Sequence, residues 1–175
     1  MMKLKRKMRV LVLAALSLIV LSGAAAFAQH QLARAERGRP EVKVLLTGAI
    51  ERGAGETVPV EKTSTVNPGE ILQWTITSQN DGSAPAREYK AVGQIPRGTM
   101  LIAGSATADG AATVVYSIDN GKTYATEPLV EEKQPDGSVK LVPAPTSMYT
   151  QVRYEWSDPL AGGSKLNASY KVRVK

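Results

Sequence analysis

The sequence contains no cysteine and only one histidine, His30. Without cysteine the chain forms no disulfide, offers no thiolate to a metal or a substrate, and has no cysteine for lipoprotein anchoring. With a single histidine and no cysteine, the common catalytic triads and zinc sites are excluded. We therefore predict a non-enzymatic protein with no catalytic residue, no cofactor and no metal site, whose fold is stabilised by packing alone.

Acidic residues are absent from the first 28 positions, which carry five of the 22 basic residues. The segment Val10–Val20 is nearly all apolar, and Ala26-Phe27-Ala28 offers a cleavage site for signal peptidase. This order of charge, apolar run and cleavage site predicts a helical secretory signal peptide over residues 1–28. The mature chain is expected to begin near Gln29 and to be periplasmic or extracellular.

Long apolar runs are also missing after the signal, so we expect no stable membrane span once it is cleaved. The mature chain has 17 basic and 16 acidic residues, and the formal charge of +6 for the whole sequence falls to about +1. This balance gives no electrostatic support for nucleic-acid binding. Residues 29–40, which include His30, are interpreted as a flexible solvated tail.

From residue 41 onward there is no run of ten or more residues with helical spacing; apolar residues alternate with polar ones between turns. The clearest strand places Leu72, Trp74 and Ile76 on one face and polar residues on the other. Eight or nine such strands predict an all-β domain over residues 41–175. Because each one-sided sheet must cover its apolar face with another, we expect an immunoglobulin-like, antiparallel, two-sheet sandwich.

Turn residues separate these strands. Proline at position 59 marks an edge strand within residues 57–65, and Pro135-Asp136-Gly137 predicts the tip of a hairpin over residues 129–142. Asp119-Asn120-Gly121 predicts a second hairpin. The strand that ends at Trp156 and the strand that contains Tyr170 are expected to pair with each other.

The order and spacing of several turn motifs resemble the bacterial conserved-repeat β-sandwich family known as domain of unknown function eleven, over Asn67–Lys175. The matching motifs are Asn67-Pro68-Gly69-Glu70, Asn80-Asp81-Gly82, Ile95-Pro96-Arg97-Gly98-Thr99, the run Tyr116–Tyr124, and Asp158-Pro159-Leu160 with Gly162-Gly163. The resemblance implies an immunoglobulin-type sandwich in an exported or surface protein. It also implies a structural or adhesive role and brings no catalytic residues.

Carboxylates are the remaining candidates for chemistry. Glu131 and Glu132 are adjacent on an expected strand and point to opposite faces, so they cannot both line one cleft. Asp119 and Asp136 lie before or near glycine in expected tight turns, where the simpler interpretation is a side chain that accepts backbone hydrogen bonds. The alternative for these two aspartates is a calcium ligand.

Aromatic residues are candidates for a sugar-binding platform. Trp74, Tyr154 and Trp156 lie on the apolar sides of their strands and are expected to fill the core. The better exposed candidates, near strand ends, are Tyr89, Tyr124 and Tyr149.

The leading hypothesis is a non-catalytic exported module with a structural or adhesive role, whose partners are other envelope proteins or further copies of itself. The segment Glu41–Ile50 has a strand pattern and follows the tail, so it could pair with the sheet edge of a neighbour and build filaments. The alternative is a periplasmic carbohydrate- or peptide-binding protein that uses a sheet face or a loop rim. An enzyme with carboxylate chemistry is a third hypothesis and needs two acids in one cleft.

Overall fold

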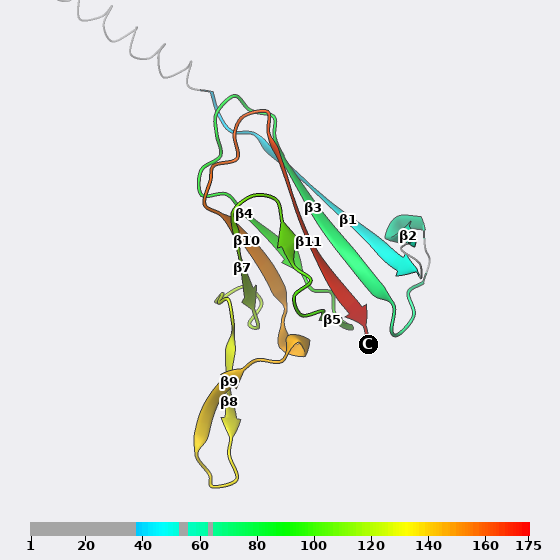
Figure 1. Cartoon of the computed structure of the whole chain (residues 1–175), viewed down its shortest axis with the longest axis vertical. Helices are drawn as coiled ribbons and strands as arrows, with labels where there is room; N and C mark the ends of the chain where they lie inside the picture. The colour runs from blue at the N-terminus through cyan, green and yellow to red at the C-terminus, as the bar shows by residue number, and fades with distance from the viewer. Residues whose placement is uncertain (1–37, 53–55, 63–64) are drawn as a thin grey trace, which may run out of the picture. The chain divides into compact units, whose positions relative to one another are not determined.

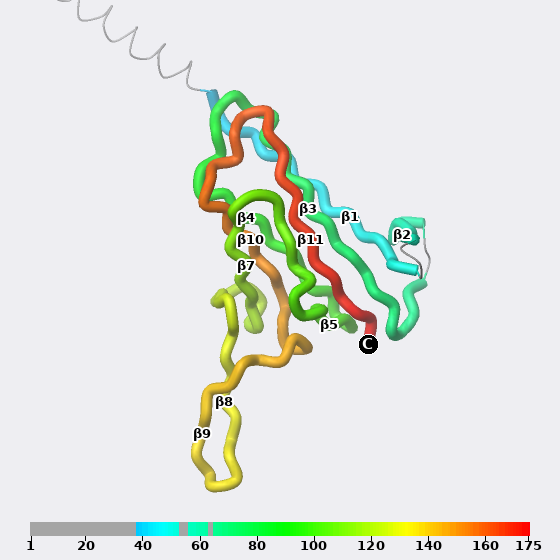
Figure 2. Tube along the Cα trace, viewed as in Figure 1, coloured from blue at the N-terminus to red at the C-terminus, as the bar shows by residue number. Residues whose placement is uncertain are grey.

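The computed structural model describes residues 38–52, 56–62 and 65–175, of which Arg39–Lys175 belong to one compact unit. Six strands form the large sheet, all paired antiparallel in the order β2-β1-β3-β11-β5, and β6 also pairs with β11 (Figures 1 and 2). These strands are β1 (Val42–Arg52), β2 (Glu56–Pro59), β3 (Ile71–Asn80), β5 (Thr99–Leu101), β6 (Thr107–Ala108) and β11 (Lys165–Val174).

The small sheet has the antiparallel order β4-β10-β7, made of β4 (Lys90–Gln94), β10 (Gln151–Trp156) and β7 (Ala112–Ser117). Within the described part of the chain, the remaining strands, β8 (Leu129–Lys133) and β9 (Val139–Pro143), pair only with each other. They form the projecting hairpin, Leu129–Pro143, which extends away from the two sheets in Figure 1. Two short 3-10 helices, η1 (Val60–Lys62) and η2 (Thr146–Met148), lie in connections.

The core lies between the large and small sheets. Alternate residues of β3 are buried, as at Leu72 and Ile76, and the small sheet contributes the inward residues of β10. Both sheets supply one continuous apolar cluster: Ile50, Leu72, Ile76, Ala91, Leu101, Val152, Tyr154, Trp156, Ala168, Tyr170 and Val172. The fold is therefore all-β and sandwich-like, as the alternating pattern predicts, because each sheet removes the apolar face of the other from water.

Asn80 is a buried polar residue that joins three segments at one end of the sandwich. Its side-chain oxygen accepts the backbone N–H of Glu41 (2.9 Å) and of Gly82 (3.1 Å). Its side-chain nitrogen donates to the carbonyls of Ala84 (2.8 Å) and Leu160 (3.0 Å). Every strong hydrogen-bonding direction of this amide is thus used, which makes its complete burial compatible with a stable fold.

Three expectations about the strands are corrected. The strands that contain Trp156 and Tyr170 do not pair; β10 lies in the small sheet and β11 in the large one. Asp119-Asn120-Gly121 does not close a hairpin, because β7 pairs with β10 and the chain after the turn makes only an isolated bridge from Ala125 to Tyr116. The described residues contain eleven strands rather than eight or nine, partly because two-residue β6 is too short to show alternation.

Other predictions hold in part. β2 is the edge strand that Pro59 indicates, but it ends at that proline, after which η1 begins. The hairpin over residues 129–142 is confirmed, with Gly137 at a positive φ of 84° in its turn. The expected signal peptide (1–28) and nearly all of the expected tail (29–40) lie outside the described residues. In the described ranges, no helix has the length and apolar character needed to cross a membrane.

Candidate functional site

The structure places Asp119 in a closed network of hydrogen bonds at the end of β7. One carboxylate oxygen accepts the Ser117 hydroxyl (2.7 Å) and the backbone N–H groups of Lys122 (3.0 Å) and Thr123 (2.9 Å), and the other accepts the Thr123 hydroxyl (2.6 Å). The hydroxyl of Thr123, its N–H and the hydroxyl of Ser117 hold the pKa of Asp119 well below its usual range. The carboxylate therefore organises a turn, in agreement with the simpler interpretation.

The other acidic candidates are similarly placed. Asp136 accepts the N–H (2.9 Å) and hydroxyl (2.6 Å) of Ser138 in the hairpin turn, and these bonds lower its pKa. Glu131 and Glu132 are consecutive residues of β8 and face opposite ways. In the part of the chain that the structure describes, no three acidic, histidine or cysteine side chains converge into a metal site. His30 lies outside the described residues.

The aromatic residues divide differently from expectation. Tyr154 and Trp156 are buried in the core as predicted, and Trp74 is half-buried against it. The three tyrosines expected to be exposed are half-buried: Tyr89 stacks on the Trp156 ring, Tyr149 packs on the Tyr116 ring, and Tyr124 lies under the Arg153 guanidinium. These contacts occupy the ring faces, so an exposed aromatic platform built from these tyrosines is not formed.

The first surface that the fold leaves open is the outer edge of β1. Residues 42–48 of β1 pair with β3 on one side, whereas β2 pairs only with residues 49–52, so no strand of the described residues covers the other side of 42–48. Val44, Leu45 and Leu46 are 59%, 61% and 48% exposed. Val44 and Leu46 share a face with buried Ile50 yet remain in solvent.

The hydrogen-bonding pattern of β1 shows which groups are free at this edge. The N–H of Asp81 donates to the carbonyl of Glu41 (2.8 Å), and the register continues with Val42 opposite Asn80. Antiparallel residues alternate between bonding inward and outward, so Leu45 bonds to β3 whereas Val44 and Leu46 direct their N–H and C=O groups to the open edge. Charged side chains and proline usually protect an edge strand from pairing with another chain. Residues 42–48 include one charged side chain, Lys43, and no proline.

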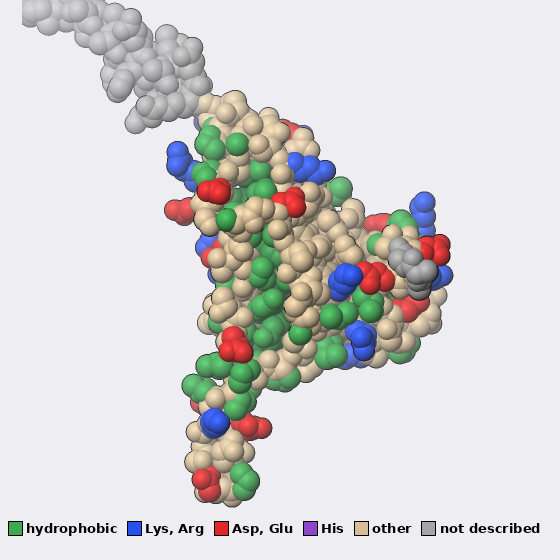
Figure 3. Space-filling view, in the orientation of Figure 1, with side chains coloured by type: hydrophobic (Ala, Val, Ile, Leu, Met, Phe, Trp, Pro, Cys, Tyr) green, Lys and Arg blue, Asp and Glu red, His purple; other side chains and the backbone are tan. Residues whose placement is uncertain are grey.

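The projecting hairpin is the second open surface. Leu129, Val139 and Leu141 share one of its faces and are 48%, 54% and 60% exposed. The Gln134 N–H donates to the Ser138 carbonyl, so the backbone groups of Ser138 point toward the partner strand. Because this direction alternates along an antiparallel strand, the N–H and C=O groups of Val139 and Leu141 point away from β8, to the open edge of β9. Figure 3 shows hydrophobic side chains beside acidic and basic ones along this hairpin.

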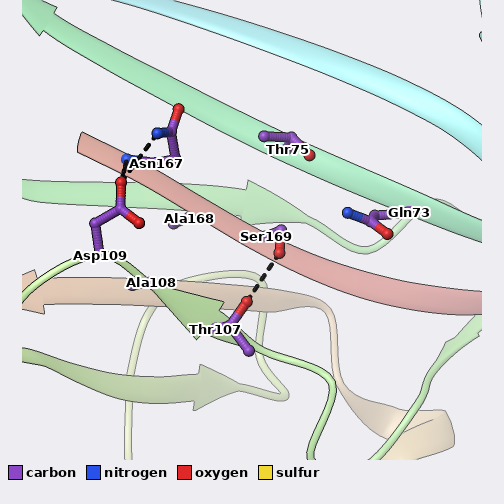
Figure 4. Close-up of a pocket in the computed structure, with 8 residues that line it drawn as sticks. All are labelled: Gln73, Thr75, Thr107, Ala108, Asp109, Asn167, Ala168 and Ser169. Atoms are coloured by element: carbon purple, nitrogen blue, oxygen red, sulfur yellow. Dashed lines mark hydrogen bonds between the residues drawn. The ribbon is translucent and has the colours of Figure 1, made fainter. Parts of the chain in front are cut away.

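The third surface is a polar groove on the face of the large sheet that turns away from the core. Two hollows, of about 260 and 390 Å³, meet at Gln73 and Thr75 of β3. The first is closed by β6 and β11 and the second by β2 and η1 (Figure 4 shows the first). We call the two together the polar groove. Its side chains are Thr47, Ala49, Thr57, Pro59, Glu61, Gln73, Thr75, Thr107, Asp109, Asn167 and Ser169, and its other lining residues are Gly48, Ala108 and Ala168.

Sequence reasoning did not identify the polar groove, because its residues come from five separate segments. The alternating pattern of β3 predicts that Gln73 and Thr75 lie on the solvent-facing side of the sheet. That prediction is the one feature of the local sequence that indicates the polar groove. The residues of β1, β11 and β6 that lie beside Gln73 and Thr75 are determined by the register of the strands. The register cannot be predicted from the local sequence pattern.

Comparison with protein-family models, with curated proteins and with solved structures found no match for this chain.

Proposed function

We propose that this protein is an exported, non-catalytic module of the bacterial cell envelope or the extracellular space, with an immunoglobulin-like sandwich and a structural role. In this proposal copies join by strand pairing: the open edge of β1 in one copy receives β9 of the projecting hairpin from the next. The observation that carries the proposal is the unpaired edge over residues 42–48 with its three exposed aliphatic side chains.

Export is supported by the composition of residues 1–28, and the structural role by the turn motifs that resemble the conserved-repeat family over Asn67–Lys175. Neither a nucleic acid nor a membrane span has a part in the proposal. In this proposal the segment Glu41–Ile50 binds the neighbouring copy through its open edge while it stays paired with β3. It therefore does not need to leave its own sheet.

The two edges suit each other chemically. Val44 and Leu46 present outward N–H and C=O groups on β1, and Val139 and Leu141 present theirs on β9. Pairing would bury aliphatic side chains from both strands and would satisfy the backbone groups of both edges. An edge with neither a proline nor several charges does little to prevent such an addition.

The contact would be heterologous, because the edge of β1 and the hairpin are different parts of the surface. A heterologous contact repeats from copy to copy and produces an open filament unless the rotation between copies closes a ring. This geometry fits a structural or adhesive role better than a role as an isolated monomer.

The test uses the exported protein, purified after signal cleavage, with size-exclusion chromatography, light scattering and negative-stain microscopy over a range of concentrations. We expect concentration-dependent oligomers. Val44→Pro removes an outward N–H from β1 and Leu141→Pro removes one from β9, so each variant alone should be monomeric. Val44→Thr keeps the N–H and the branched shape and serves as the matched control, which should assemble.

Mixing the two proline variants sharpens the test. The Val44→Pro copy keeps a working hairpin and the Leu141→Pro copy keeps a working edge, so the mixture should form pairs that do not grow further. A wild-type protein that remains monomeric at high concentration contradicts the proposal, as do oligomers that persist in both proline variants.

A further inference from the structure

The polar groove is independent of the edges used in the proposed assembly, and its chemistry points to a ligand of its own. We infer that it binds a neutral glycan chain, which lies across the strands of the large sheet. The inference rests on four properties of the groove: the row of hydroxyl groups, the side chains that have no protein hydrogen-bond partner, the charge of the lining and the shape of the surface.

Hydroxyl groups cross the sheet in one row. The register places Thr47 of β1 opposite Thr75 of β3, Thr75 opposite Ser169 of β11, and Ser169 opposite Thr107 of β6. Neighbouring strands are about 4.8 Å apart, so this row offers four hydroxyls at a nearly regular spacing. Because a hydroxyl both donates and accepts hydrogen bonds, such a row matches a ligand that carries many hydroxyls of its own.

Some of these groups are already bonded and others are free. Thr107 and Ser169 bond to each other (2.9 Å), and Asn167 receives the Thr77 hydroxyl (3.0 Å) and donates to Asp109 (2.9 Å). By contrast, the side chains of Gln73 and Thr75 have no hydrogen-bond partner among the described residues, although both are half-buried. The centre of the groove therefore holds the donors and acceptors that a ligand can use.

The charge of the lining selects against other ligands. Its ionisable side chains are Asp109 and Glu61, one at each end, and the part of the lining that the structure describes holds no lysine or arginine. The nearest row contains Lys171, whose charge is paired with Glu51. An anionic polymer would meet two carboxylates without a matching cation, and an apolar ligand would leave the amide of Gln73 unsatisfied.

The shape of the surface favours a chain over a small molecule. The two hollows together run from β6 and β11, past β3, to β2 and η1, so the groove crosses the strands rather than following one of them. A peptide that added to this sheet would need a free backbone edge, and the middle strands β3 and β11 are paired on both sides. A chain of sugar units can instead hydrogen-bond to side chains along the whole row.

The experiment measures binding of cellohexaose, maltohexaose and chitohexaose by titration calorimetry and by ¹H–¹⁵N NMR, with a heparin hexasaccharide as the anionic comparison. We expect saturable binding of at least one neutral hexasaccharide, with shifts at the groove residues. Thr75→Val keeps the branched shape and removes the hydroxyl, and Gln73→Met keeps the length and removes the amide. Each should weaken binding roughly three- to tenfold, since each removes one or two neutral hydrogen bonds.

Gln79→Met is the matched control, because Gln79 lies on the same face of β3 but outside the groove, and its binding should equal that of the wild type. Thermal unfolding and the NMR spectrum establish that each variant is folded. Three results would overturn the inference: no binding of any neutral hexasaccharide up to about 10 mM, equal affinity in the wild type and in both groove variants, or binding of the heparin fragment alone. The Val44→Pro variant should bind like the wild type, which separates this site from assembly.

Discussion

The two-sheet body and the projecting hairpin are made from the same local pattern of alternating residues, but they differ in what lies behind the strands. In the body, the inward residues of β3, β10 and β11 meet across the sandwich and are buried. In the hairpin, Leu129, Val139 and Leu141 share one face, yet no third strand or second sheet of the described residues covers them.

The difference shows that alternation creates an apolar face without deciding what will cover it. A two-stranded hairpin in water is marginally stable, because it buries little and its backbone bonds are exposed. Here the hairpin is held at its base, where the N–H of Ala144 donates to the carbonyl of Pro128 (2.8 Å) and both residues are buried. The body should therefore be sensitive to single substitutions, and the hairpin tolerant of them.

The largest effect is expected for Asn80→Ala. The substitution leaves the N–H groups of Glu41 and Gly82 and the carbonyl of Ala84 without their partner. The Leu160 carbonyl loses one of its two hydrogen bonds and keeps the one from the Ala86 N–H. We expect a loss of about 3 kcal/mol in the free energy of unfolding, measured by urea denaturation. Gln79→Ala, one residue earlier on the exposed face, is the control; a loss below about 1 kcal/mol for Asn80→Ala would show that the polar junction is dispensable.

Gly93→Ala tests how closely the large and small sheets pack against each other. A Cβ atom at this position of β4 would lie 2.3 Å from Cε1 of Tyr170 in β11, which is closer than atoms can approach. Because that ring is buried and donates its hydroxyl to the Gln94 carbonyl (2.5 Å), it has little room to move. We expect a cost of about 2 kcal/mol and a lower melting temperature. Val92→Ala, at the neighbouring exposed position, should change the melting temperature little.

Asp119→Asn tests a polar network at the surface. The hydroxyl and N–H of Thr123 and the hydroxyl of Ser117 lower the pKa of Asp119 in the folded protein relative to the unfolded chain. A lowered folded pKa contributes stability that is present above the unfolded value, near 4, and is lost as the pH falls toward the folded value. The variant should therefore be less stable than the wild type at pH 7, with a difference that shrinks below about pH 4. Urea denaturation at several pH values measures it, and a difference independent of pH would contradict this explanation.

The smallest effect is expected for Leu141→Ala in the projecting hairpin. Its side chain is mostly exposed, so in dilute monomer the free energy of unfolding should change by less than about 0.5 kcal/mol. Val152→Ala in β10, which is buried, is the comparison and should cost about 2 kcal/mol. Hydrogen exchange should show the same contrast, with the amides of β8 and β9 exchanging much faster than those of β3 and β10. Equal protection would mean that the hairpin is covered in solution.

Local pattern was sufficient to predict the strands whose side chains alternate over a solvent-facing sheet. Leu72 and Ile76 are buried and Gln73 and Thr75 lie on the opposite face, as the sequence predicts. The tip of the hairpin at Gly137 was also predictable, because a positive φ favours glycine there.

The choice of partners was not predictable from local pattern. The strands around Trp156 and Tyr170 lie close in the sequence, yet they enter different sheets because each pairs with strands from earlier in the chain. The polar groove was missed for the same reason: Thr47, Thr75, Ser169 and Thr107 become neighbours only through long-range register. The tyrosines near strand ends were misjudged because their stacking partners are distant in sequence, as with Tyr89 on Trp156.

Asp109 is an exposed residue that connects the core to the end wall of the polar groove. Its carbonyl accepts the indole N–H of Trp156 (2.7 Å), while its carboxylate receives the N–H (2.9 Å) and the side-chain amide (2.9 Å) of Asn167. The wall is thus rigid before anything binds, so a ligand there loses its own conformational entropy without having to order the protein. A substitution of Trp156 should consequently loosen that wall from a distance, without altering any group that faces the groove.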